Sequence, residues 1–168
     1  RYYAGTAWIV VNNYRKGDYA PYLFKTEDFG KTWIRLADKV NGYALTFIQD
    51  PVEPNLAFLG TENGLWMSMD AGLTWQQFKN GFPSVSTMDI TIQEPESALI
   101  VGTFGRAIWV LDDLLTLREI AAKRLKKGIT ALPMNDAVQV KGLFINPPGN
   151  IWTGFHTTFE GENKVFQR

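Results

Sequence analysis

An eight-position polar motif that occurs twice at a fixed spacing constrains the fold of this chain most. Its two copies, 42 residues apart, are Thr26-x-Asp28-x-Gly30-x-Thr32-Trp33 and Ser68-x-Asp70-x-Gly72-x-Thr74-Trp75. Each copy joins two apolar segments rich in strand-forming residues, which is typical of a hairpin turn. We call it the turn motif. Two copies at one period predict a repeat architecture.

The strands around the turn motif repeat as well. Segment 98–113 matches 55–70, segment 88–95 matches 44–51, and the Gly-Thr pair at 60–61 returns at 102–103. In this third unit only Asp112 or Asp113 survives of the motif. A period of about 42 residues that holds four short strands is typical of a β-propeller blade. The sequence therefore predicts an all-β fold, with two to three four-stranded blades of a partial β-propeller in residues 1–114.

Blades need neighbours, because one blade alone cannot bury both faces of its sheet. Propellers usually have about 4–8 blades, so we expect further blades upstream of this sequence.

Within the turn motif, each residue type has a local folding role. The Asp carboxylate accepts hydrogen bonds from turn N–H groups, the Ser or Thr hydroxyl reinforces them, and Gly allows a positive φ. The Trp that starts the next strand can bury about 150–250 Å². We therefore predict a structural role for all ten motif residues, with ligand contact as the alternative.

The pattern changes after residue 114. Residues 115–140 are predicted to be a helical connector and linker, with a helix over 114–127 in which Thr116-x-x-Glu119 fits a capping box. The basic residues at the end of this helix indicate either a solvated connector or an amphipathic helix for a membrane or partner. Residues 141–168 are predicted to begin a second β domain, the first strands of a β-sandwich.

The turn motif is similar to the Asp-box, or BNR repeat, which is known in sialidases, in xyloglucan-active glycosidases and in sortilin-like (Vps10-type) propellers. Segments PYLFKTEDFGKTW, LGTENGLWMSMDAGLTW and GTFGRAIWVLDDL resemble successive blades of secreted bacterial proteins of the sortilin-like, BNR-repeat kind. The resemblance implies that the motif lies at the outer edge of the propeller, away from a central ligand face. It also implies a secreted, periplasmic or cell-surface location.

Composition excludes several functions. The chain has no cysteine, and its 17 basic and 17 acidic residues balance, so thiol chemistry and attraction to nucleic acid are not expected. No apolar run is long enough to span a membrane. We predict no cofactor or metal site and no catalytic residue in this segment. Arg15 and Arg106 are the candidates for a ligand face, and loop 12–19 is the best candidate to reach a partner.

Three functions remain open. The first is binding of an unknown glycan or protein ligand by a sortilin-like propeller. The second is a glycoside hydrolase, sialidase or xyloglucanase-like, whose catalytic residues lie mainly in other blades. Such an enzyme needs facing carboxylates or an Arg cluster, and no pair stands out among Asp18, Asp50, Glu53, Glu62, Asp89 and Glu94. The third is a purely structural propeller.

Overall fold

The computed structural model describes residues 3–79, 81–123 and 131–132. Its elements confirm the predicted all-β class, with one short helix in the predicted connector. The bounds are β1 Ala7–Asn13, η1 Tyr14–Lys16, β2 Asp18–Thr26, β3 Ile34–Leu36, β4 Ala44–Gln49, β5 Ala57–Thr61, β6 Gly64–Ser68, β7 Gln76–Gln77, β8 Thr87–Gln93, β9 Ala98–Thr103, β10 Ile108–Leu111 and α1 Leu115–Ala121. The predicted second β domain, residues 141–168, lies outside the described residues.

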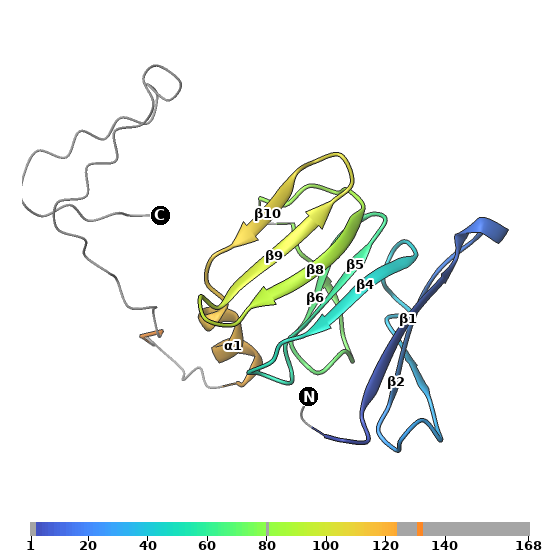
Figure 1. Cartoon of the computed structure of the whole chain (residues 1–168), viewed down its shortest axis with the longest axis horizontal. Coiled ribbons are helices and arrows are strands. Elements are labelled where there is room, and N and C mark those ends of the chain that lie inside the picture. Colours follow the sequence, from blue (N-terminus) through green and yellow to red (C-terminus); the bar gives the residue numbers. More distant parts are fainter. Residues whose placement is uncertain (1–2, 80, 124–130, 133–168) are drawn as a thin grey trace, which may run out of the picture. The chain divides into compact units, whose positions relative to one another are not determined.

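The strands form three small antiparallel sheets (Figure 1). Sheet A has the order β1-β2-β3, sheet B β4-β5-β6-β7 and sheet C β10-β9-β8. Strand β4 contacts β1 of sheet A on one side and β8 of sheet C on the other. Sheet B is therefore packed between its two neighbours, an arrangement consistent with a partial propeller.

The turn motif shows how the three sheets correspond. It connects β6 to β7 in sheet B and β2 to β3 in sheet A, so β1–β3 correspond to β5–β7. Strands β8–β10 correspond to β4–β6, because they repeat the same segments. Sheet B thus has all four strands of a repeat, sheet A the last three and sheet C the first three.

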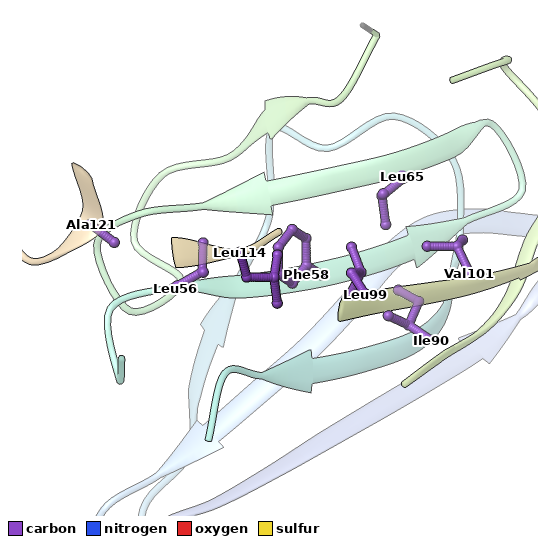
Figure 2. Packing of buried hydrophobic residues seen from close by; sticks show 8 residues of the cluster. All are labelled: Leu56, Phe58, Leu65, Ile90, Leu99, Val101, Leu114 and Ala121. Atoms are coloured by element: carbon purple, nitrogen blue, oxygen red, sulfur yellow. The ribbon is translucent and has the colours of Figure 1, made fainter. Parts of the chain in front are cut away.

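Two hydrophobic clusters hold the sheets together. The first cluster lies between sheets B and C and includes Leu56, Phe58 and Leu65 from one side and Leu99 and Val101 from the other (Figure 2). The second cluster lies between sheets A and B, and Leu23, Leu36, Val40, Leu59, Trp66 and Trp75 take part in it. Each fully buried Leu or Phe contributes about 1.5–3 kcal/mol, so these clusters are the main force that stacks the sheets.

Sheets B and C approach each other closely at Gly60. A Cβ atom on this residue would lie 2.8 Å from the carbonyl oxygen of Thr87 and 2.6 Å from Cγ2 of Thr46. The equivalent Gly102 of sheet C would place its Cβ 3.7 Å from the carbonyl oxygen of Asp89, an ordinary contact. Packing of the strands therefore requires glycine at position 60, whereas position 102 has room for a Cβ atom.

Some predicted boundaries were wrong. The motif Trp was predicted to start the next strand, but that strand begins after it, at Ile34 in sheet A and at Gln76 in sheet B. The loop predicted at 12–19 is also shorter, since β1 continues to Asn13, which pairs with Asp18. Only Tyr14–Lys16 and Gly17, with φ +78°, remain between the two strands.

Helix α1 differs from its prediction at both ends. The predicted capping box is wrong: the N-cap is Leu114, which makes no side-chain cap. The Asp113 carboxylate accepts a hydrogen bond from the N–H of Leu115 at 2.7 Å instead. The helix ends at Ala121, before the predicted residue 127, and Lys123 has a φ of +56°.

A buried ion pair fixes α1 to sheet B. Arg118 is 4% exposed and Asp50, at the end of β4, is fully buried. Nε of Arg118 lies 3.1 and 3.0 Å from the two carboxylate oxygens of Asp50, and Nη1 donates to Oγ of Ser97 at 2.8 Å. Arg118, which the sequence pattern did not single out, thus joins α1 to the turn after β4 and to the turn between β8 and β9.

Candidate functional site

The first turn motif forms a closed hydrogen-bond network. Asp28 Oδ1 accepts bonds from the Thr26 hydroxyl at 2.8 Å and the Thr32 N–H at 2.9 Å, and its Oδ2 accepts the Thr32 hydroxyl at 2.6 Å. The Gly30 N–H donates to the Thr26 hydroxyl at 3.0 Å. The indole N–H of Trp33 donates to the Gly30 carbonyl at 3.1 Å. All five residues are thus brought together within one turn.

The second turn motif repeats this network bond for bond. Asp70 accepts bonds from the Ser68 hydroxyl at 2.8 Å and from the Thr74 N–H and hydroxyl at 2.8 and 2.5 Å. The Gly72 N–H donates to the Ser68 hydroxyl at 2.9 Å, and Trp75 donates to the Gly72 carbonyl at 3.0 Å. Gly72 has a φ of +87° and Gly30 one of +84°. This geometry supports the structural role, which stays a prediction.

The motif carboxylates are held in their charged form. Hydrogen bonds from the Thr32 hydroxyl and N–H and from the Thr26 hydroxyl lower the pKa of Asp28 to about 2. Burial of the Asp70 carboxyl group raises its pKa, but hydrogen bonds from Thr74 and Ser68 lower the pKa by more. The pKa of Asp70 is therefore also below its usual value. A carboxylate with a lowered pKa is a poor proton donor near neutral pH, so neither Asp is suited to general acid catalysis.

A second set of loops gathers at the other ends of these strands, which we call the hairpin end. It carries the β1–β2, β5–β6 and β9–β10 hairpins (Figure 1). Hydrogen bonds through Ser86 link the β5–β6 and β9–β10 hairpins: its hydroxyl donates to the Glu62 carbonyl at 3.1 Å, and its carbonyl accepts a bond from Phe104 N–H at 2.9 Å. Near the β1–β2 hairpin, Nδ2 of Asn12 donates to the Ala44 carbonyl at 3.3 Å, and the neighbouring Tyr43 carbonyl accepts a bond from Glu62 N–H at 3.3 Å. The hairpin end is therefore one continuous surface.

The two predicted ligand-face arginines both lie at the hairpin end. Arg15 is in the β1–β2 hairpin and Arg106 in the β9–β10 hairpin, and both are exposed. Nε of Arg15 lies 3.4 Å from the Tyr14 hydroxyl oxygen, and its guanidinium lies 6.0 Å from the centre of that ring. The backbone carbonyl of Arg106 accepts a bond from the indole of Trp109. They occupy different hairpins, at opposite sides of sheet B, so they do not form an arginine cluster.

Three tyrosine rings beside Arg15 form what we call the tyrosine cluster. The ring of Tyr14 stacks on that of Tyr43 at 4.8 Å, and Tyr19 lies 6.1 Å from Tyr43. Tyr14 and Tyr19 remain 37% and 58% exposed. Burial and the nearby charge of Glu62 raise the pKa of Tyr43. Sequence reasoning found the hairpin by its polarity and missed Tyr43, because nothing local connects it to the β1–β2 hairpin.

Three of the acidic residues considered for glycoside hydrolysis form hydrogen bonds or ion pairs with nearby side chains. Asp50 binds Arg118, Asp18 accepts the Tyr22 hydroxyl at 2.7 Å, and the Glu53 carboxylate binds Asn55. Within the described part of the chain, no group of three or more His, Asp or Glu side chains could hold a metal ion. His156, the single histidine, lies outside that part. These contacts give no support to a facing carboxylate pair.

Comparison with known proteins gives two distant matches. The chain is 31% identical over 104 residues to the "Vacuolar protein sorting/targeting protein 10" of Phaeosphaeria nodorum, a match that covers 56% of this chain and 7% of that protein. It is 37% identical over 57 residues to the protein of the same name from Mycosarcoma maydis, covering 33% of this chain and 4% of that protein.

No family model matches the chain. No helix among the described residues is long and apolar enough to cross a membrane. The chain is thus similar to proteins of the Vps10, sortilin-like type over about half its length, and it spans only a small part of their length.

Proposed function

We propose that this chain contributes blades to an Asp-box β-propeller that binds protein ligands at its hairpin end. The tyrosine cluster carries the proposal, because it leaves two aromatic rings and Arg15 exposed on a surface outside both hydrophobic clusters. Tyr and Arg are the residue types that dominate the binding energy of protein interfaces. The ring of Tyr14 is held by stacking on Tyr43, so this side chain loses little entropy when a ligand binds.

The similarity to proteins named for vacuolar protein sorting and targeting favours a protein ligand over a glycan. A protein of this type would present the blades in a luminal or extracellular compartment, which agrees with the location implied by the turn motif. Neither relative is named as a glycosidase, and no contact described above favours hydrolysis. We therefore propose binding and do not propose catalysis.

Selection of displayed random peptides on the intact chain tests this proposal. Peptides enriched on the wild type are expected to lose at least about tenfold in affinity when Tyr14→Ala or Arg15→Ala is introduced, since central aromatic and Arg contacts are each worth 1.4 kcal/mol or more. Arg106→Ala tests whether the ligand extends to the third hairpin.

Tyr3→Ala is the matched control. Tyr3 is 77% exposed and its carbonyl accepts a bond from Thr6 N–H, before β1 and away from the hairpin end. Selected peptides should bind this variant as they bind the wild type. If the selected peptides bound equally well without Tyr14 and Arg15, the proposed site would be contradicted. If the chain hydrolysed aryl glycosides or sialosides, and replacement of one carboxylate abolished this activity, the proposed function would be contradicted.

A further inference from the structure

The charged residues of this chain are divided unevenly between the two ends of its strands, although its net charge is zero. We call the end that carries the turn motifs and α1 the motif end. Among the described residues, its loops and helix hold ten acidic residues and only three basic ones. These segments are 27–33, 50–56, 69–75, 94–97 and 112–123. The motif end is therefore strongly negative.

The hairpin end has the opposite charge. Besides the three hairpins it includes loops 37–43 and 78–86, because these lead into β4 and β8, whose first residues pair with the last residues of β5 and β9. Among the described residues, these loops and hairpin tips carry two acidic residues, Asp38 and Glu62, and five basic ones. The five basic residues are Arg15, Lys16, Lys39, Lys79 and Arg106.

These five basic side chains are accessible to a ligand. All five residues are exposed, and within the described part of the chain none of them forms an ion pair. The acidic residues near them are engaged in the fold: Oδ1 of Asp38 lies 2.9 Å from Nε of Arg35, and Asp18 accepts the Tyr22 hydroxyl at 2.7 Å. Glu62 is only partly exposed. An acidic ligand would therefore meet cations that lack a carboxylate partner.

The basic residues are spread over the hairpin end rather than gathered at one point. Two belong to the β1–β2 hairpin, two to the loops that join successive sheets, and one to the β9–β10 hairpin. Stacked sheets lie about 10 Å apart, so three sheets cover roughly 20 Å, the length of about six extended residues. One phosphate or one terminal carboxylate is too small to contact all of these cations. Their spacing fits a run of several carboxylates.

Exposed aromatic rings lie on the same surface. Tyr14 and Tyr19 of the tyrosine cluster are 37% and 58% exposed, and Phe104, in the β9–β10 hairpin, is 76% exposed. The guanidinium of Arg15 lies 6.0 Å from the centre of the Tyr14 ring, so a cation and an aromatic ring are presented side by side. The surface thus offers partners both for carboxylates and for apolar side chains of one ligand.

We propose that the hairpin end recognises an acidic, extended segment of its protein ligand, with carboxylates on the basic side chains and apolar side chains on the exposed rings. This inference rests on the proposed function, because it names the class of ligand for the same surface. The charge division supports it: a positive surface at one end and a negative surface at the other attract an acidic segment to the hairpin end and repel it from the motif end.

Fluorescence anisotropy of a rhodamine-labelled octapeptide, EEYYEEYY, on the full chain tests the proposal. Saturable binding is expected, and the uncharged peptide QQYYQQYY should bind at least tenfold more weakly. The screening length falls from about 10 Å at 0.1 M salt to about 3 Å at 1 M. The affinity of the acidic peptide should therefore fall at least fivefold over this range, and the affinity of the glutamine peptide should stay constant.

Lys16→Glu and Lys31→Glu are a matched pair of variants. Both lysines are exposed and both changes alter the net charge equally, but Lys31 lies in the first turn motif, at the motif end. Lys16→Glu should weaken binding of the acidic peptide at least fivefold, mainly through slower association, whereas Lys31→Glu should change it less than twofold. Lys79→Glu should act like Lys16→Glu, because the segment extends from sheet A toward sheet C.

Absence of saturable binding, or equal binding of the two peptides, would overturn the proposal. Equal effects of Lys16→Glu and Lys31→Glu would do the same, since overall charge and not the hairpin end would then be the cause. Equal competition by a single-stranded oligonucleotide with as many charges as the peptide would also overturn it, because the surface would then bind any polyanion.

Failure of this inference can be told apart from failure of the proposed function. If peptides selected from the random library depended on Tyr14 and Arg15 but were not acidic and ignored Lys16→Glu, the proposed function would stand and this inference would fail. If the acidic peptide depended on Lys16 and Lys79 but not on Tyr14, the inference would stand and the role of the tyrosine cluster would be contradicted.

Discussion

The carboxylate of Asp70 connects both sides of its turn, because it accepts bonds from Ser68 before the turn and from Thr74 after it. Asp70→Ala should lower the free energy of unfolding by about 1–3 kcal/mol, since these donors lose their acceptor in a partly buried turn. Denaturant unfolding with an unchanged m-value measures the effect.

Glu27→Ala is the control at the residue scale. Glu27 lies beside the first motif but is exposed and forms only a surface ion pair with Lys25, which is worth little. Its replacement should change stability by less than about 0.5 kcal/mol. If Asp70→Ala left stability unchanged and weakened peptide binding selectively, the motif would be a ligand site and its structural role would be refuted.

The lowered pKa of Asp28 makes stability depend on pH in a defined window. Because the pKa is about 2 in the folded chain and 3.8 normally, the unfolded state binds the proton first as the pH falls. The stabilisation is complete above about pH 4 and is lost between about pH 4 and pH 2. Asp28→Asn removes this titration, so its melting temperature should fall less than that of the wild type between these two pH values. An equal fall in both proteins would show that Asp28 does not contribute.

At the scale of elements, the close approach of β5 to β8 depends on Gly60. Gly60→Ala should lower the free energy of unfolding by about 1–3 kcal/mol, because the new Cβ would overlap the backbone of Thr87 and push the sheets apart. The repeat offers a matched control in Gly102→Ala, where the nearest contact of the Cβ is ordinary. Thermal unfolding of both variants should show a clear loss only at Gly60, and equal losses would mean that packing between the sheets is not the cause.

The ion pair that holds α1 can be tested in the same way. Arg118→Met leaves the fully buried carboxylate of Asp50 without its guanidinium partner, and loss of one member of a buried pair costs about 3–5 kcal/mol. The double variant Asp50→Asn with Arg118→Met removes both charges and should recover part of that loss. Circular dichroism at 222 nm and denaturant unfolding measure the effect. If the double variant were no more stable than Arg118→Met, the charge on Asp50 would not be the cause.

Sequence patterns predicted the strands well and the contacts between distant elements poorly. The alternation in β2, the apolar runs of β5 and β9 and the 42-residue period were visible in the chain itself, so these strands and both turn motifs could be predicted. The pair of Arg118 and Asp50 spans 68 residues and leaves no periodic trace. Tyr43 joins Tyr14 only because sheets A and B stack. The end of α1 at Ala121 was missed, since helix propensity favours continuation to residue 127.

At the scale of the whole molecule, the three sheets are unequally covered. Sheet B has neighbours on both faces, and every residue of β5 is buried. Sheets A and C each leave one face open in the described part of the chain, with Ile9 and Val11 on one and Ile108 and Val110 on the other among the exposed apolar residues. In repeat architectures stability comes largely from such nearest-neighbour interfaces. The middle sheet should therefore be the most stable part of the chain.

Hydrogen exchange can measure this gradient directly. Amides of β5 should exchange at least about tenfold more slowly than the equivalent amides of β9, a difference of 1.4 kcal/mol in opening free energy, because only β5 lies in a sheet covered on both faces. The two strands have the same place in the repeat and a similar sequence, so β9 is an internal control for local effects. Equal protection of β5 and β9 would contradict the predicted difference in stability between sheets B and C. It would indicate that another part of the protein or a second molecule covers the outer face of sheet C in solution.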